Sequence, residues 1–152
     1  MTRAIPIAGL CAVALLAGAG MAGASTLVIG NGEAKECSDA ALGGKADSHA
    51  IMACTTALEV ETLNFRDRAR TYVNRGATLV GEDRFREGVE QIDKGLSLGV
   101  KDPEKAFFNR GLANEALGDL QAAYRDYSRA AELKPDWAAP KTELARFSVK
   151  RP

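Results

Sequence analysis

The chain has 152 residues, among them 20 bases, 20 acids and a single histidine. This balance excludes a bulk electrostatic attraction to nucleic acid or to an anionic membrane surface, so we expect neither as a partner. A chain of this length holds one domain with a modest core.

The N-terminal stretch predicts an export signal. Arg3 supplies a positive charge, residues 5–16 are apolar and uncharged, and the small residues 22–24 form a cleavage signal before Ser25. We therefore expect residues 1–24 to be a signal peptide and the mature protein to be periplasmic or secreted. The apolar stretch is short for a membrane span, so we expect no stable membrane insertion after cleavage; an uncleaved anchor is the alternative.

Two cysteines, Cys37 and Cys54, remain after removal of the signal peptide, because Cys11 lies within it. An even number of cysteines in an exported chain predicts a disulfide, which would contribute roughly 3 kcal/mol for a loop of this size. Free thiols, or a redox or metal pair, are the alternatives. Sixteen intervening residues do not make a C-x-x-C motif, and only His49 stands nearby as a soft ligand, so we expect no metal site.

Residues 25–34 read as an extended lead-in. Residues 35–62 predict a degenerate hairpin, in which a short helix ends at Gly43-Gly44 and a second helix starts behind Asp47 or Ser48. The unit is too short to bury much surface, and a covalent link between its two helices suits it.

A full hairpin is predicted next. Asn64 is expected to cap a helix over about residues 65–80, and Asp83 to cap its partner over about residues 84–98.

A second full hairpin opens on Asp102-Pro103, an N-cap followed by proline at the first helical position. Asp119 is expected to cap its second helix, and Pro135 ends that helix. Residues 138–152 then hold a charged helix, over about residues 140–149, and a tail. A solenoid needs such a polar capping helix at its open end.

The two full hairpins repeat one another. Residues 72–76 (Tyr-Val-Asn-Arg-Gly) are echoed by residues 107–111 (Phe-Phe-Asn-Arg-Gly), 35 positions later. A period near 34 with alternating small and bulky residues is typical of stacked helical hairpins. Gly76, Gly88 and Gly95 each cost roughly 0.5–1 kcal/mol inside a helix, which indicates either a steric need or a soft hairpin.

These residues resemble the tetratricopeptide repeat. The resemblance is strongest over residues 103–137, where the matching residues are Phe107, Gly111, Gly118, Ala123, Tyr127, Ala130 and Pro135. Residues 69–102 match less fully, with Gly88 and Gly95 where alanine is usual and Val100 where the closing proline is expected. The resemblance implies an all-α, short right-handed helical-hairpin solenoid with a C-terminal capping helix, a concave peptide-binding face, and no catalytic activity or cofactor.

By the pattern of the family, the first helix of each hairpin lines the concave face. The implied peptide-binding residues are Arg70, Val73, Asn74, Lys105, Phe108, Asn109 and Leu112. The amides are suited to a peptide backbone, the cations to a carboxylate, and the apolar side chains to a groove floor. In the alternative reading the asparagines bond a neighbouring helix, Arg75 and Arg110 are solvated, and the C-terminal helix covers the apolar residues.

No catalytic arrangement emerges from the sequence. His49 is the sole histidine and lacks a nucleophile at a suitable spacing, and residues 30–32 (Gly-Asn-Gly) lack the lysine of a phosphate loop. We therefore expect a non-enzymatic scaffold or adaptor of the bacterial cell envelope with a protein or peptide partner. The alternatives are a periplasmic chaperone or assembly accessory that holds extended peptides, and a helical glycan hydrolase, which needs paired carboxylates in a cleft.

Overall fold

The computed structural model describes residues 32–149, with side chains to residue 147, and this part of the chain folds into seven α-helices. They are α1 (Glu33–Leu42), α2 (Ser48–Val60), α3 (Phe65–Gly81), α4 (Phe85–Ser97), α5 (Pro103–Ala116), α6 (Leu120–Leu133) and α7 (Ala138–Val149). None of these helices is both long and apolar enough to cross a membrane. The expected signal peptide and residues 25–31 of the expected lead-in lie outside the described residues.

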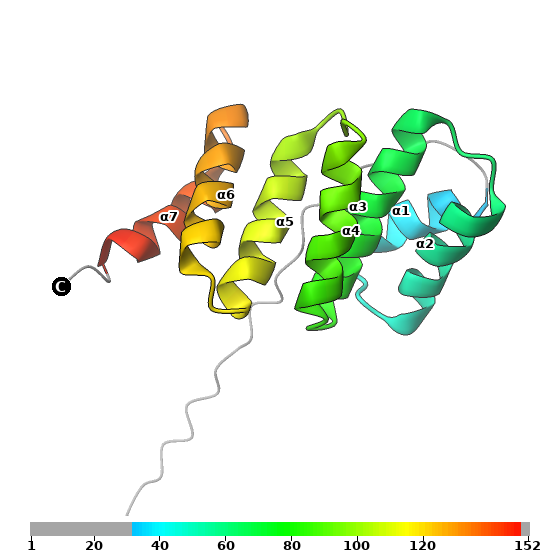
Figure 1. The fold of residues 1–152 in the computed structure, drawn as a ribbon, viewed down its shortest axis with the longest axis horizontal. Coiled ribbons are helices and arrows are strands. Elements are labelled where there is room, and N and C mark those ends of the chain that lie inside the picture. Colours follow the sequence, from blue (N-terminus) through cyan, green and yellow to red (C-terminus); the bar gives the residue numbers. More distant parts are fainter. Residues whose placement is uncertain (1–31, 150–152) are drawn as a thin grey trace, which may run out of the picture.

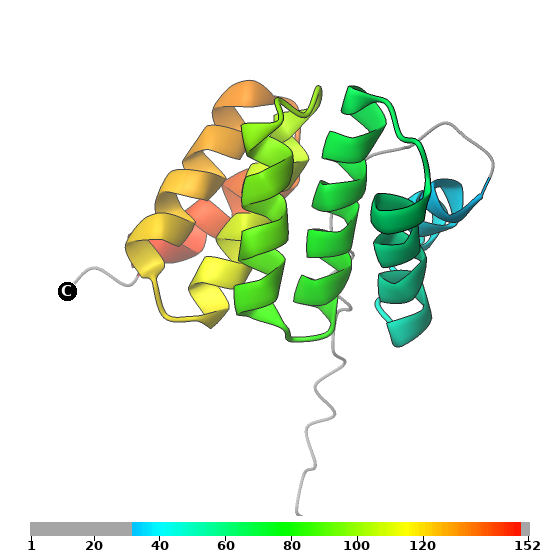
Figure 2. The same ribbon diagram turned by 45° about the vertical axis from the view of Figure 1, so that its right-hand side comes forward.

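The helices pair into consecutive hairpins, α1–α2, α3–α4 and α5–α6, that stack in a row and end with α7 (Figure 1; Figure 2). Helices α1, α3 and α5 touch their neighbours in this row, whereas α2, α4 and α6 make no comparable contacts with one another. The more closely packed row lies on the inside of a curved array, so α1, α3 and α5 form its concave side. The predicted all-α solenoid is confirmed.

Most helix starts follow the predicted capping. The side chain of Asp47 accepts a hydrogen bond from Ala50 N at 2.8 Å, and the side chains of Asn64 and Asp119 make the equivalent bonds for α3 and α6. The prediction for Asp83 was wrong. Asp83 adopts a left-handed φ of 59° and forms the turn, so Arg84 takes the N-cap position without a side-chain cap bond.

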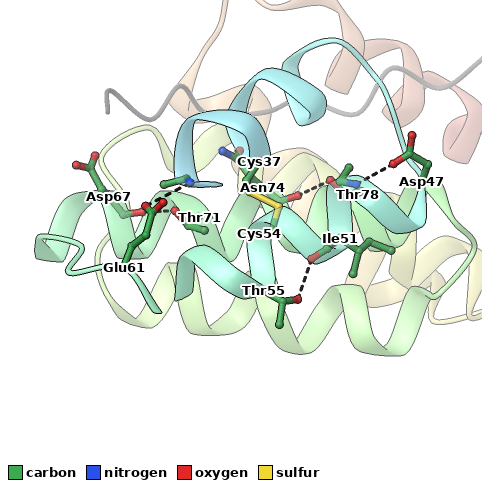
Figure 3. The surroundings of a disulfide bond; sticks show 12 residues. Cys37, Asp47, Ile51, Cys54, Thr55, Glu61, Asp67, Thr71, Asn74 and Thr78 are labelled. Carbon is green, nitrogen blue, oxygen red and sulfur yellow. Dashed lines mark hydrogen bonds between the residues drawn. A yellow bond between two sulfur atoms is a disulfide. The ribbon is translucent and has the colours of Figure 1, made fainter. Parts of the chain in front are cut away.

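Helix α1 begins at Glu33, two residues inside the segment expected to be extended. The carboxylate of Glu61 accepts hydrogen bonds from the backbone N–H groups of Glu33, at 2.6 Å, and Ala34, at 3.4 Å (Figure 3). A negative charge at this end of a helix is favourable because the N–H groups there lack intrahelical partners. Glu61 therefore fixes the start of α1 against the loop between α2 and α3.

The predicted disulfide between Cys37 and Cys54 is present. It joins α1 to α2, and both cysteines are fully buried (Figure 3). The bond thus closes the shortest hairpin of the array, where the apolar core consists mainly of alanine and cysteine.

Reduction of this disulfide is expected to lower the free energy of unfolding by about 3 kcal/mol, because it releases a loop of 17 residues in the unfolded chain. Amide hydrogen exchange with and without reductant should show α1 and α2 opening before α3 to α6. A Cys37→Ala, Cys54→Ala chain is the control, and its hydrogen exchange and melting should be the same with and without reductant. Identical melting of the native chain in both conditions would refute a stabilising role.

The glycines of the α3–α4 hairpin answer a steric need. A Cβ on Gly76 would lie 2.5 Å from Ile92 Cγ1 and 2.8 Å from the carbonyl oxygen of Gly88. A Cβ on Gly95 would lie 2.5 Å from Val73 Cγ2. The two helices thus approach too closely for a side chain at these positions, which supports the interpretation of a steric need.

Helix α7 begins at Ala138, two residues before the predicted start, and covers the end of the array. The ring of Trp137 packs on Phe108 of α5 with centroids 4.9 Å apart, and Phe147 packs on Tyr127 at 6.0 Å. The last helix therefore closes an aromatic core rather than lying loosely on α6.

Candidate functional site

The two asparagines predicted to bind a peptide backbone are fully buried. Asn74 lies beside the disulfide, where α1 packs on α3, and its backbone carbonyl oxygen accepts a hydrogen bond from Thr78 Oγ1 (Figure 3). Asn109 holds the equivalent position on α5, which packs on α3. Contact between neighbouring helices of the concave row closes these positions, so the assigned peptide-contacting role is corrected to a structural one.

Substitution of Asn109 by alanine is accordingly expected to lower the free energy of unfolding by about 1–3 kcal/mol, because it leaves buried polar groups without a partner. Thermal unfolding measures this directly, and Asn74→Ala should behave alike. Glu90→Ala, an exposed change on α4, is the control. An unchanged midpoint for both variants would show that the asparagines do not stabilise the fold, and a peptide-binding role would again be open to them.

Two of the three expected groove-floor residues belong to the core instead. Val73 is fully buried and packs against Ala69 and Ile92. Phe108 is 6% exposed and is covered by Trp137 and Tyr127. The ring contacts of Phe108 thus come from α6 and from Trp137, the residue that precedes α7.

The two predicted cations, Arg70 and Lys105, are both half-buried on the concave row. Arg70 Nη1 lies 3.8 Å from Asp67 Oδ1, a long and weak ion pair, and Arg70 Nε is buried without a hydrogen-bond partner. Its capacity to hold a carboxylate stays a prediction.

Arg110 is not solvated, contrary to the expectation. Its Nε and Nη2 donate to the buried carboxylate of Asp126 at 2.9 and 2.7 Å, and its Nη1 donates to Asp93 at 2.5 Å. The hydrogen bonds to Asp126 raise the pKa of Arg110 above its usual value. Asn114 also donates to Asp126, so one carboxylate joins two side chains of α5 to α6, while Arg110 reaches back to α4.

The preceding hairpin lacks this pair. Arg75 corresponds to Arg110, but Gln91 stands where Asp126 stands in the next repeat. Arg75 Nε and Gln91 Oε1 are both buried without a hydrogen-bond partner. One change of residue type therefore leaves two buried polar atoms unsatisfied at the equivalent place.

The concave row carries an apolar pocket between the C-terminal halves of α3 and α5, called here the α3–α5 pocket. Its volume is about 270 Å³. Its lining residues are Ala77, Val80, Gly81, Asp83, Phe85, Leu112 and Ala116. Leu112 is the predicted site residue that lines this pocket. Phe85 and Ala116 were missed, although Leu112 and Ala116 stand four residues apart on one helix face.

The lining sets the chemistry that the pocket accepts. Asp83 is its sole charged lining residue, and the other side chains are apolar. Its volume lies below the roughly 300–1,000 Å³ of small-molecule sites, and suits one or two apolar side chains. Within residues 32–147, no group of three metal-ligating side chains comes together.

Comparison with known proteins identifies the architecture. Residues 104–137 match the family model of the Tetratricopeptide repeat. The chain thus contains a tetratricopeptide repeat, and its helices have the fold of a TPR domain. Its structure is similar to the first TPR domain of the human RPAP3 protein, with a TM-score of 0.63 and 25% identity, over 76% of this chain and 87% of that domain. It is equally similar, at 24% identity over 77% and 92%, to the second TPR domain of human RPAP3 in complex with the HSP70 peptide SGPTIEEVD; that likeness concerns the fold.

Two curated proteins contain a related segment. This chain is 34% identical over 86 residues to protein unc-45 homolog B of Xenopus tropicalis, and 31% identical over 78 residues to peptidyl-prolyl cis-trans isomerase FKBP4 of Homo sapiens. The matches cover 57% and 51% of this chain but only 9% and 17% of those proteins. The chain thus spans less than a fifth of the length of these relatives. The shared fold is one that mediates protein–protein interaction.

Proposed function

We propose that this protein is a non-enzymatic scaffold or adaptor that binds an extended peptide of a partner protein on its concave face. The observation that carries the proposal is the α3–α5 pocket, an apolar hollow on the row of helices that faces inward. An apolar side chain of the partner fills it, and the burial of that side chain supplies most of the binding free energy.

The distance between the pocket and Arg70 predicts how far apart the apolar anchor and an acidic group lie in the ligand. Arg70 precedes Ala77 by seven residues of α3, or about 10 Å along the helix axis. About three residues of extended peptide span that distance. The proposed ligand therefore carries an acidic group, held by Arg70 and Lys105, about three residues from its apolar anchor.

We place the protein in the bacterial cell envelope, as a periplasmic or secreted protein. Two observations support this location. Residues 1–24 have the pattern of an export signal, and Cys37 and Cys54 form a buried disulfide of the kind that persists in oxidising compartments. The peptide complex of the second TPR domain of human RPAP3 illustrates that the same fold accommodates a peptide.

Filling the pocket tests the proposal. Ala116→Trp places a large ring in the pocket from an exposed position on α5, so the fold should survive. For a peptide selected from a random library by binding to the native chain, we expect about tenfold weaker binding or more. Leu117→Trp, at an exposed neighbour outside the lining, is the matched control. Equal affinities of the two variants would reject the pocket as the binding site.

A periplasmic chaperone or assembly accessory that holds extended peptides is the second candidate. The largely apolar lining, with Asp83 as its one charged residue, favours this function because an apolar pocket accepts many peptide sequences. Titrations of the selected peptide at low and high salt separate the two functions. Affinity that falls with salt favours the adaptor, since charge pairs are screened, and salt-insensitive binding of unrelated apolar peptides favours the chaperone.

A further inference from the structure

Four of the described helices, α1, α3, α4 and α5, end in the same turn. The residue at the C′ position donates its backbone N–H to the carbonyl three residues back, and the next residue donates to the carbonyl five residues back. The C′ residue of this motif takes a left-handed φ, and glycine is usual there because it has no Cβ. The C′ residues are Gly44 (φ 66°), Asp83 (φ 59°), Gly99 (φ 70°) and Gly118 (φ 84°). Within residues 32–149, Asp83 is the one residue other than glycine with a positive φ.

The contacts of the described residues do not explain an aspartate in this turn. The carboxylate of Asp83 makes no hydrogen bond or ion pair with any of them. The adjacent cation, Arg84, donates from Nε and Nη2 to the carboxylate of Glu87 at 2.7 and 2.6 Å. Gly118 makes the same turn at the end of α5 without a side chain. The turn after α3 therefore carries an unpaired negative charge that its own structure does not require.

This carboxylate lies at the α3–α5 pocket. Asp83 is exposed and is the sole charged residue of the lining, beside the apolar side chains of Phe85 and Leu112. The backbone that carries it is held in place, since the N–H groups of Asp83 and Arg84 bond to α3 carbonyls at 3.2 and 2.9 Å. The structure thus sets one negative charge at the wall of an apolar hollow of about 270 Å³.

A carboxylate at this place distinguishes between ligands that fill the pocket equally well. The burial of an apolar side chain contributes the same free energy whatever residue stands next to it in the peptide. A neighbouring lysine or arginine gains an ion pair with Asp83, whereas a neighbouring acid is repelled. Because Asp83 is exposed, the ion pair changes the affinity by only a few-fold.

We infer that Asp83 selects, among the peptides that fill the α3–α5 pocket, those with lysine or arginine next to the apolar anchor. This inference rests on the proposed function and adds a second charge to its ligand. Asp83 follows the C-terminal end of α3, whereas Arg70 lies near its N-terminal end. The base and the acid of the ligand therefore flank the anchor on opposite sides, which gives the bound peptide one direction.

Selection of peptides from a random library, by the native full chain and by Asp83→Asn, tests the inference. Asparagine tolerates the left-handed conformation as aspartate does, so the variant removes the charge and keeps the turn. We expect lysine or arginine beside the apolar consensus residue in peptides selected by the native chain, and no such preference with the variant. Glu82→Gln, an exposed acid of the same turn outside the lining, is the matched control and should keep the preference.

A peptide selected by the native chain then allows the effect to be measured. Replacement of its basic residue by glutamine should weaken binding to the native chain about fivefold and leave binding to Asp83→Asn unchanged. Asp83→Gly should also lose the preference, at an unchanged or higher melting midpoint, because glycine suits the C′ position. Equal effects of the glutamine on the native and Asp83→Asn chains would overturn the inference.

The Ala116→Trp variant separates a failure of this inference from a failure of the proposed function. If the tryptophan weakens binding while Asp83→Asn keeps the preference for a base, the pocket binds the peptide but Asp83 does not select it, and the inference alone is wrong. If the tryptophan leaves the affinity of the selected peptide unchanged, the proposed site is wrong and so is the inference.

Discussion

Replacing Gly76 by valine is expected to disrupt the packing of α3 on α4 and to lower the free energy of unfolding by about 3 kcal/mol or more. The added Cβ meets Ile92 Cγ1 at 2.5 Å and the carbonyl oxygen of Gly88 at 2.8 Å, and the latter belongs to the backbone of the facing helix. A backbone atom gives way only if the whole helix moves. Thermal unfolding should show a midpoint lower by about 10 °C or more.

Two further variants separate this clash from a general effect of valine in a helix. Glu90→Val, at an exposed position on α4, should shift the midpoint by only a few degrees. Gly76→Ala combined with Ile92→Ala should be less destabilised than the sum of the single changes, because removal of Cγ1 makes room for the new Cβ. If the free-energy changes of Gly76→Ala and Ile92→Ala simply add in the double variant, the new Cβ and the Ile92 side chain do not touch.

Removal of the Asp126 carboxylate is expected to cost about 3–5 kcal/mol, because Asp126→Ala leaves the guanidinium of Arg110 in a half-buried site without its main partner. The loss should appear in denaturant unfolding as a lower midpoint with an unchanged slope. The contact joins α6 to α5, and Asp93 extends it to α4, so the change weakens the link between the two repeats.

The preceding repeat supplies the converse experiment. Gln91→Asp gives Arg75 the partner that Arg110 has, and we expect it to raise the melting midpoint by a few degrees. An Arg110→Met, Asp126→Ala double variant should recover part of the stability lost by Asp126→Ala alone. A loss below about 1 kcal/mol for Asp126→Ala would show the pair to be no stronger than a surface ion pair.

The helices and the disulfide were predictable because their signals are local. Asn64 and Asp119 cap the helices that follow them, and Pro103 marks the start of α5. Cys37 and Cys54 are the two cysteines outside the predicted signal peptide, so the prediction allowed a single pairing. The steric role of Gly76 was also accessible, since its cost inside a helix called for a reason.

The candidate site was less predictable, because it depends on how closely neighbouring helices stack. Helical periodicity places Asn74 and Leu112 on the same general side of their helices, yet contact with α1 closes the first and leaves the second beside a pocket. Arg110 meets Asp126 across 16 residues and Asp93 across 17, and no local pattern encodes either contact. Phe85 reaches the pocket from α4, a helix that the repeat pattern assigns to the outer row.

Site-specific photo-crosslinking in the producing cell would show whether a partner protein occupies the α3–α5 pocket. A photo-reactive amino acid replaces Ala116 in the pocket lining or, as the matched position outside it, the exposed Leu120 of α6. We expect a discrete adduct with a partner protein from position 116, weakened when Leu112 is changed to aspartate and absent from position 120. Equal adducts from both positions, or none from position 116 while the partner remains bound, would contradict it.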